Sequence, residues 1–313
     1  MKNKVVVIGS YNTDLTIRAK KIPRPGETVI GGIFNESGGG KGANQAVAAV
    51  RAGADVNFIA RVGNDVLGKK GIQRLTGEKI DTRHVFLDND VSTGVAFVVI
   101  DERGENSIVV ASGANARLSP SDIETAKDAI SLASVILVQL ESPLETVRAA
   151  IKKSHENNAT VILNPAPAQH LENNLLEGID IITPNKIEAE MITGIKITDE
   201  ESLRQITKKF FEYGIKNVFI TLGPKGIFAG LPRTMELIPA FKVRSIDSTG
   251  AGDVFSGSLA AFIADGMSIE KAVKMAIVSS SISVTRMGTQ NSAPRRNEIE
   301  QFMESFTTSE AFT

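Results

Sequence analysis

The 313-residue sequence contains no cysteine, and only 5% of its residues are aromatic. The absence of cysteine excludes a disulfide framework and thiolate metal sites. No apolar run approaches the roughly 18 residues that a membrane-spanning helix needs. The run near the N-terminus, in MKNKVVVIGS, is also too short for a secretory signal, so we interpret it as a buried strand. We therefore expect a cytoplasmic protein that does not enter a membrane.

The chain also lacks an excess of charge of either sign. Lys and Arg together number 35, and Asp and Glu together number 36, which gives a formal net charge of −1. The longest basic runs are pairs, which argues against a nucleic acid as partner. The three histidines are scattered without metal-ligand spacing, so we expect no catalytic triad.

Short β-branched runs alternate with amphipathic stretches along most of the chain. Near-continuous apolar strands between helices are typical of a parallel sheet that is covered on both faces. The sequence therefore predicts an α/β fold. We expect strands at 4–9, 56–60, 134–140, 160–165, 179–184 and 217–223, and helices at 42–52, 66–76, 121–131, 143–156, 185–192 and 199–213.

Two stretches, 15–36 and 84–111, interrupt this alternation with strand patterns and turn residues. Within the second stretch, GVAFVVIDERGENSIVV predicts a hairpin that turns at DERGEN. We predict that both stretches form a small β-sheet lid. A partner subunit is one way to cover an exposed face or edge of such a sheet. The α/β domain then consists of 1–14, 37–83 and 112–313, and we expect its tail to fray after about residue 305.

The segment SGGGKGANQAVAAVRAGA (37–54) places a glycine turn at the start of a helix. Free N–H groups there, with Lys41 and Asn44, suit a polyhydroxylated or anionic ligand. The turn fits the dinucleotide fingerprint but does not directly follow the first strand, which disfavours a nicotinamide cofactor. Gly42 after Lys41 excludes a Walker loop. An ordinary glycine turn with an exposed lysine is the alternative.

The segment GSYNTDL (9–15) follows the first strand, where ligands of open α/β sheets bind. Asn12 and Asp14 are two residues apart, so in an extended chain their side chains point to the same side. An amide and a carboxylate placed in this way suit vicinal hydroxyls. The alternative is a simple Asx-turn.

The segment TPNKIEAEMITG (183–194) predicts another helix start, with Pro184 in its first turn. Asn185 and Glu188 lie three residues apart on one face of that helix. The pair fits a magnesium–phosphate site that works through water. A glutamate that merely faces the helix dipole is the alternative.

The segment VRSIDSTGAGDVFSGSLAAFI (243–263) places Gly250, Ala251 and Gly252 directly before Asp253 and an apolar helix. Successive N–H groups in such a turn, with the helix dipole, form an anion hole for a transferring phosphoryl group. Asp253 lies beside this hole and is placed to take a proton from an attacking hydroxyl. The alternative, a helix N-cap, does not explain the glycines.

Taken together, these segments resemble the ribokinase-type carbohydrate kinases. The resemblance covers nearly the whole chain, and GGKGANQA and D-x-TGAGD-x-F-x-G look like the two signatures of the family. It implies a Rossmann-like sheet and a β-sheet lid that commonly forms a homodimer contact. It also implies transfer of the γ-phosphate of ATP to the 5-hydroxyl of D-ribose. The other matching segments are GSYNTD, GENSIVVASGANARL, VQLESP, TPNKIEAE and TLGPKG.

The resemblance also implies roles for residues at matching positions. Asp253 looks like the general base, and Gly250, Ala251 and Gly252 look like the anion hole. Glu188 looks like the organiser of hydrated Mg²⁺. The sugar-binding set is Asn12, Asp14, Gly40, Lys41, Asn44, Glu141 and Asp253, and the nucleotide-binding set is Asn185, Thr221, Gly223, Gly226 and Gly252. The positions that match a K⁺ site are Asp247, Thr249, Ser283, Arg286, Gly288 and Ser292.

Several alternatives remain at this point. Asn12, Asp14 and the complete GGKGAN favour a furanose that has its 2- and 3-hydroxyls. Within the family, the alternatives are a deoxyribokinase, a fructokinase or another sugar or nucleoside kinase. Outside it, they are a catalytically silent sugar-binding protein and a dehydrogenase. Ile277 departs from the family pattern, since relatives often carry a polar residue there beside the adenine.

Overall fold

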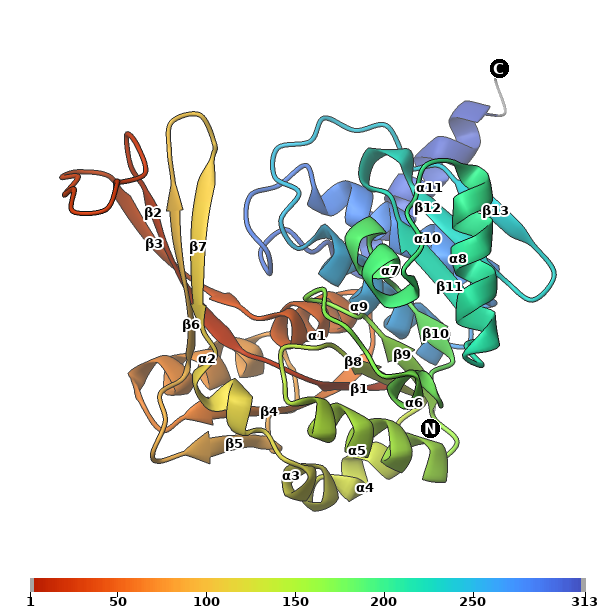
Figure 1. Cartoon of the computed structure of the whole chain (residues 1–313), viewed down its shortest axis with the longest axis horizontal. Coiled ribbons are helices and arrows are strands. Elements are labelled where there is room, and N and C mark those ends of the chain that lie inside the picture. The colour runs from red at the N-terminus through yellow and green to blue at the C-terminus, as the bar shows by residue number, and fades with distance from the viewer. Residues whose placement is uncertain (1–2, 311–313) are drawn as a thin grey trace.

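The computed structural model describes residues 3–310, with side chains to residue 305. Within these residues, a nine-stranded sheet lies between two layers of helices, and a four-stranded sheet projects from it (Figure 1). The predicted α/β fold with a separate small sheet is therefore confirmed. The predicted fraying after residue 305 lies mostly outside the residues and side chains that are described. No described helix is long and apolar enough to cross a membrane.

The large sheet has the strand order β13-β12-β11-β10-β9-β8-β1-β4-β5. The strands from β11 to β5 in this order pair in parallel, and β12 and β13 add an antiparallel edge. The strands are β1 (Lys4–Ile8), β4 (Asp55–Gly63), β5 (Val85–Asp88), β8 (Val135–Val138), β9 (Thr160–Leu163), β10 (Ile181–Ile182), β11 (Asn217–Thr221), β12 (Ile227–Gly230) and β13 (Met235–Ile238).

Alternate residues of the central strands face opposite helical layers. In β1, Val5 and Val7 pack into the cluster that contains α1, α9 and α10, whereas Val6 and Ile8 pack into the cluster that contains α5 and α8. Helices cover both faces, as buried parallel strands require. The α-helices are α1 (Lys41–Arg51), α2 (Val66–Gly77), α3 (Pro120–Thr125), α4 (Lys127–Ser131), α5 (Leu144–Glu156), α6 (Asn173–Leu176), α7 (Lys186–Thr193), α8 (Glu200–Glu212), α9 (Ala251–Ala264), α10 (Ile269–Ser283) and α11 (Arg296–Glu310).

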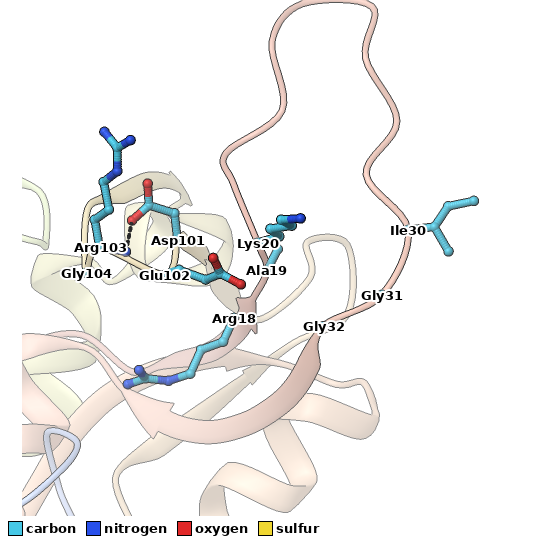
Figure 2. A pocket seen from close by; sticks show the side chains of 10 residues that line it. All are labelled: Arg18, Ala19, Lys20, Ile30, Gly31, Gly32, Asp101, Glu102, Arg103 and Gly104. Atoms are coloured by element: carbon cyan, nitrogen blue, oxygen red, sulfur yellow. Dashed lines mark hydrogen bonds between the residues drawn. The ribbon is translucent and has the colours of Figure 1, made fainter.

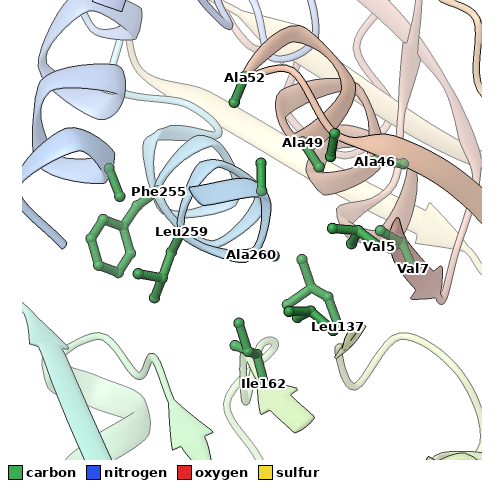
Figure 3. Close-up of a cluster of buried hydrophobic side chains, with 14 of the residues drawn as sticks. Val5, Val7, Ala46, Ala49, Ala52, Leu137, Ile162, Phe255, Leu259 and Ala260 are labelled. Carbon is green, nitrogen blue, oxygen red and sulfur yellow. The ribbon is translucent and has the colours of Figure 1, made fainter. Parts of the chain in front are cut away.

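Helices α1 and α9 pack closely on one face of the sheet. Figure 3 shows small side chains at this contact, among them Ala46 and Ala49 of α1 and Ala260 of α9. Gly257 of α9 also faces α1, because a Cβ at this position would clash with the carbonyl oxygen of Gln45. The close approach brings the first turns of the two helices together, and those turns carry most of the predicted site.

The small sheet has the order β3-β2-β6-β7 and comprises β2 (Asn12–Arg18), β3 (Ile33–Gly39), β6 (Gly94–Ile100) and β7 (Asn106–Ala111). The predicted β6–β7 hairpin is confirmed. One segment differs from expectation: Val85–Asp88, predicted as part of the lid, pairs with β4 in the large sheet. The strands of the small sheet also reach inward to Asn12 and Gly39, so the lid runs directly into the candidate site.

Candidate active site

The predicted anion hole forms the start of α9. Gly250 is the N-cap residue, and its φ of 76° is a left-handed conformation that glycine adopts easily. A Cβ at Gly252 would meet nothing within 4 Å, so the backbone there is open to a ligand. The N–H groups of the first turn have no acceptor within the helix, although that of Ala251 donates to the backbone oxygen of Ser248 at 3.2 Å, and a turn of this kind can bind an anion.

Asp253 lies in this first turn and is buried, with 6% of its surface exposed. Its Oδ2 accepts a hydrogen bond from Nδ2 of Asn44 at 3.0 Å, and its Oδ1 accepts one from Nε2 of Gln45 at 3.0 Å. Since Gly250 is the N-cap, the carboxylate of Asp253 does not cap the helix. Two amides of α1 hold it instead beside the glycine turn, where a base for an incoming hydroxyl is needed.

The glycine turn before α1 lies against the end of β1. Gly40 has a φ of 85°, and a Cβ there would lie 2.7 Å from the backbone nitrogen of Asn12. A Cβ at Gly42 would lie 2.6 Å from the backbone nitrogen of Ser10. Real Cβ contacts are longer, so these positions need glycine for the two segments to meet. The meeting places Lys41 beside the residues that follow β1.

Lys41 is half-buried among carboxylates, which does not fit the alternative of an exposed lysine. The charge of Asp253 is the main cause that raises the pKa of Lys41, and Glu141 and Glu188 add to it against the effect of burial. The backbone nitrogen of Lys41 donates to Oε2 of Glu141 at 3.0 Å. The hydroxyl of Ser10 donates to the same oxygen at 2.5 Å. Glu141 therefore joins the end of β1 to the start of α1.

Asp14 faces the same space from the lid. Burial is the main cause that raises the pKa of Asp14 from 3.8 to about 7, and the charges of Glu141 and Asp253 raise it further. Gly39 on the neighbouring strand provides room, because a Cβ there would collide with the Asp14 carboxyl. Such a perturbed carboxyl in a group of like charges is typical of a binding or catalytic site.

Asn12 lies in strand β2 with Asp14, not in an Asx-turn. Its Oδ1 accepts a hydrogen bond from Nδ2 of Asn115 at 2.8 Å. Asn115 also bonds both backbone groups of Tyr11, accepting from its nitrogen and donating to its oxygen at 2.9 Å each. Sequence reasoning did not identify Asn115 as a site residue. The matching segment GENSIVVASGANARL contains it, but a single asparagine in a loop does not by itself indicate a role.

Asn185 and Glu188 form a reciprocal capping box at α7. The backbone nitrogen of Glu188 donates to Oδ1 of Asn185 at 2.9 Å, and the backbone nitrogen of Asn185 donates to Oε2 of Glu188 at 2.8 Å. Pro184 therefore precedes the N-cap, and its expected place in the first turn was wrong. Burial is the main cause that raises the pKa of Glu188, against the hydrogen bond from Asn185 and the charge of Lys41.

Four of the five predicted nucleotide positions lie just after β10 or from the end of β11 to the turn that follows it, and the fifth, Gly252, lies at the start of α9. Asn185 forms a parallel bridge with Thr221. In the turn that follows, Gly223 and Gly226 have φ values of 60° and 100°, which favour glycine. Ile277 is buried in the core with 2% of its surface exposed. Its side chain therefore belongs to the packing of α10.

Asp247 organises the predicted K⁺ segment. Its Oδ1 accepts from the backbone nitrogen of Thr249 at 2.9 Å, and its Oδ2 accepts from that of Gly288 at 3.0 Å. Burial alone would raise the pKa of Asp247. The hydrogen bonds from Thr249 and Gly288 outweigh this effect, so the pKa lies below its ordinary value. Among the described residues, no group of three or more His, Cys, Asp or Glu could hold a metal ion. Three of the other predicted positions have side chains that are engaged elsewhere: Ser283 donates to Ser280 O, Ser292 donates to Thr289 O, and Arg286 pairs with Glu298.

An open hollow of about 630 Å³ lies at the free end of the small sheet (Figure 2). Residues of both charge signs line it, including Arg18, Lys20, Asp101 and Arg103. None of the predicted site residues contributes to it. The candidate active site is therefore the convergence of α1, α9, β2 and the strand ends, where carboxylates, a lysine and an anion hole face one another.

Comparison with known proteins shows the class to which this fold and this site belong. The sequence profile of the pfkB family carbohydrate kinases matches residues 2–296, and the chain belongs to this family. It is 41% identical over 304 residues to a ribokinase of Haemophilus influenzae, covering 97% of this chain and 99% of that one. It is 36% identical over 302 residues to a deoxyribokinase of Salmonella typhi, covering 96% and 97%.

A solved structure supports the same relationship. The ribokinase of Arabidopsis thaliana complexed with ribose and ATP superposes with a TM-score of 0.91 at 29% identity, covering 96% of this chain and 98% of that one. The predicted resemblance and the Rossmann-like fold are confirmed. Membership of a kinase family also argues against the dehydrogenase alternative.

Proposed function

We propose that the protein phosphorylates D-ribose at O5 with ATP and releases D-ribose 5-phosphate and ADP. The observation that carries this proposal is the buried Asp253 carboxylate, held by two amides beside an open glycine turn. The ribokinase relatives support the choice of ribose. An intact base and anion hole argue against a catalytically silent sugar-binding protein.

In this mechanism, the oxygen of the 5-hydroxyl bonds to the γ-phosphorus while Asp253 takes the proton of that hydroxyl. The bond between the γ-phosphorus and the bridging oxygen of ATP breaks, and ADP leaves with that electron pair. The N–H groups of Gly250, Ala251 and Gly252 stabilise the charge on the moving phosphoryl group. Catalysis then rests mainly on positioning and charge stabilisation.

The sugar lies in the space between α1 and the lid. Asp14 and the amide of Asn12 bind vicinal hydroxyls from one side of β2. Asn44 offers its Oδ1, which is buried without a hydrogen-bond partner among the described residues. Such an orphan acceptor is expected to find its partner in the substrate. The remaining members of the proposed sugar site are Gly40, Lys41, Glu141 and Asp253.

The nucleotide lies on the other side of the anion hole, beside the ends of β10 and β11. Its proposed contacts are Asn185, Thr221, Gly223, Gly226 and Gly252. Glu188 would hold the Mg²⁺ of Mg·ATP through water, since Mg²⁺ commonly keeps several waters in such sites, and the ion would supply positive charge to the phosphates. The carboxylate oxygens of Glu188 are ligands of the kind that Mg²⁺ binds.

A potassium ion is the proposed monovalent activator. Asp247 ties the segment before the anion hole to the loop at Gly288, and oxygen donors suit a cation of this type. The proposed ligand positions are Asp247, Thr249, Ser283, Arg286, Gly288 and Ser292, several of them through backbone carbonyls.

A second copy of the chain covers the outer face of the lid in the proposed homodimer. Leu15, Phe97 and Val109 are paired across β2, β6 and β7, on the face opposite Asp14. Phe97 and Val109 are 51% and 70% exposed. A contiguous exposed apolar patch of this kind often marks a protein interface.

The cytoplasm stays the predicted location of the protein.

Deoxyribose is the second candidate substrate, because a deoxyribokinase relative aligns over nearly the same length. A sugar panel with coupled detection of ADP distinguishes the two. We expect the highest kcat/KM for ribose, and lower values for 2-deoxyribose and fructose. A preference for either of those sugars would overturn the ribose assignment but not the kinase mechanism.

A further inference from the structure

Asp253 is backed by a chain of buried side-chain amides that extends away from the proposed sugar site. Gln45 is fully buried, and its Nε2 donates to Oδ1 of Asp253 at 3.0 Å and to Oδ1 of Asn164 at 2.9 Å. Oε1 of Gln45 accepts from Nε2 of Gln139 at 2.6 Å. Asn164 in turn donates to the backbone oxygen of Thr183 at 2.9 Å.

The charge on Asp253 fixes the orientation of every amide in this chain. An ionised carboxylate only accepts hydrogen bonds, so Gln45 must present its NH₂ group to it. The carbonyl of Gln45 then points the other way, and Gln139 must present its own NH₂ group there. A flip at any member would bring two acceptors together. The chain is therefore self-consistent in a single orientation, which is set by the carboxylate.

The anchors of the chain are rigid parts of the sheet. Gln139, Asn164 and Thr183 are each the first residue after one of the neighbouring parallel strands β8, β9 and β10. Parallel strands place these positions along one edge. Helix α9, which carries Asp253, is thus tied through Gln45 to three consecutive strand ends.

Gln139 leaves one polar atom of this chain without a partner. Its Oε1 is buried without a hydrogen-bond partner among the described residues. It lies over Gly9, where any Cβ would collide with it. An unpaired buried acceptor is unfavourable for folding. The orientation that leaves it unpaired is the one that serves Asp253.

We propose that Gln45 is a positioning residue for phosphoryl transfer: it holds the Asp253 carboxylate toward the sugar hydroxyl, and Gln139 and Asn164 hold Gln45. This inference rests on the proposed function, in which Asp253 is the base. Gln45 acts through Asp253 and has no proposed contact with the sugar or the nucleotide. It should therefore affect turnover more than binding.

The test replaces Gln45 by methionine, which has a similar shape but cannot donate. Loss of a residue that orients a catalytic group lowers activity by about 10- to 100-fold. We expect a kcat reduced by that factor, with the KM for ribose and for ATP within about threefold of wild type. An unchanged kcat, or a loss confined to KM, would overturn the proposal.

Asn57→Leu is the matched control. Asn57 is also a buried amide that donates to a carboxylate, with 3.0 Å between its Nδ2 and Oδ2 of Asp81, but on β4 outside the site. Both variants should melt at lower temperature than wild type. Asn57→Leu should keep kcat within about twofold of wild type. A similar loss of kcat in both variants would reduce the role of Gln45 to general stability.

A double-mutant cycle separates a positioning role from a structural one. If Gln45 acts through the carboxylate, Gln45→Met should change kcat by less than about twofold in the Asp253→Asn background. If the double variant loses kcat by the product of the two separate losses, the proposal is contradicted. If Gln45→Met does not fold, Gln139→Met tests the next residue of the chain. We expect this variant to lose less kcat than Gln45→Met would, and an unchanged kcat would contradict the proposal.

The same experiments separate this inference from the function on which it rests. Asp253→Asn with wild-type turnover would remove the proposed base, and the role of Gln45 with it. A strong loss in Asp253→Asn combined with normal turnover in Gln45→Met would leave the base in place and overturn the positioning role alone.

Discussion

Nδ2 of Asn44 donates a hydrogen bond of 3.0 Å to Oδ2 of Asp253, although the two residues are 209 positions apart in the chain. This bond joins the two glycine-rich segments on which the predicted function depends. It also places the proposed sugar-binding amide and the proposed base in direct contact. We therefore expect a substitution of Asn44 to affect sugar binding and chemistry together.

Asn44→Ala removes both the donor to Asp253 and the buried unpaired oxygen that is proposed to bind a sugar hydroxyl. We expect kcat/KM for ribose to fall by about 100-fold or more, with changes in both kcat and KM. Steady-state kinetics with coupled ADP detection measures this. A variant with the ribose KM of wild type would show that Asn44 does not contact the sugar.

Gly257→Ala tests the close contact between α1 and α9, because its Cβ would clash with the backbone oxygen of Gln45. We expect a loss of about 1–3 kcal/mol in the free energy of unfolding, together with a lower kcat as Asp253 moves. Gly77→Ala in α2 is the control, since a Cβ there meets nothing within 4 Å. Urea denaturation measures the free energy of unfolding of both variants. If Gly257→Ala is as stable as Gly77→Ala, the two helices do not pack as closely as described.

Asp14 links stability to pH. Its pKa in the folded protein is about 7 against an ordinary value of 3.8, so between these values the folded state holds a proton that the unfolded state has lost. Stability should therefore fall as the pH rises from about 4 to 7. Asp14→Asn removes this effect, so the variant should melt higher than wild type at pH 8 and similarly at pH 4.

The same substitution should weaken ribose binding, because it removes a carboxylate that is proposed to accept from the sugar. Differential scanning calorimetry at both pH values measures the stability, and titration calorimetry with ribose measures the affinity. A variant that is less stable than wild type at pH 8 would show that the carboxyl is not destabilising in the folded protein.

The proposed cation site predicts a dependence on the monovalent ion. Replacing K⁺ by Na⁺ or by a bulky organic cation should lower activity at fixed Mg·ATP. Asp247→Ala should raise the K⁺ concentration needed for half-maximal activity, because it frees the backbone groups at Thr249 and Gly288. Activity that is indifferent to the cation in the wild-type enzyme would count against the site.

The sequence predicted the fold because its core strands are apolar along their whole length, which leaves few alternatives to a covered parallel sheet. The sequence places Val85–Asp88 in the lid because it is a short strand pattern followed by turn residues, like the strands after it. Nothing local distinguishes such a strand from the hairpin that follows it. Its pairing with β4 is set by tertiary contacts.

The residues of the site that stand in glycine-rich motifs could be predicted, since glycine at a helix start has a specific physical meaning. Asn115, Gln139 and Asn164 could not. Each is a single amide, after a strand or in a loop, and its partners lie far away in the sequence: 119 positions separate Gln45 from Asn164. Only the fold brings these amides to Asp253 and to the end of β1.

Asp253→Asn tests the central claim most directly. The substitution keeps the shape of the side chain but removes its capacity to take the proton of the sugar hydroxyl. We predict that turnover of ribose falls by about 100-fold or more, while calorimetric binding of ribose changes by less than about tenfold. Turnover equal to that of wild type, with ribose still bound, would contradict the account.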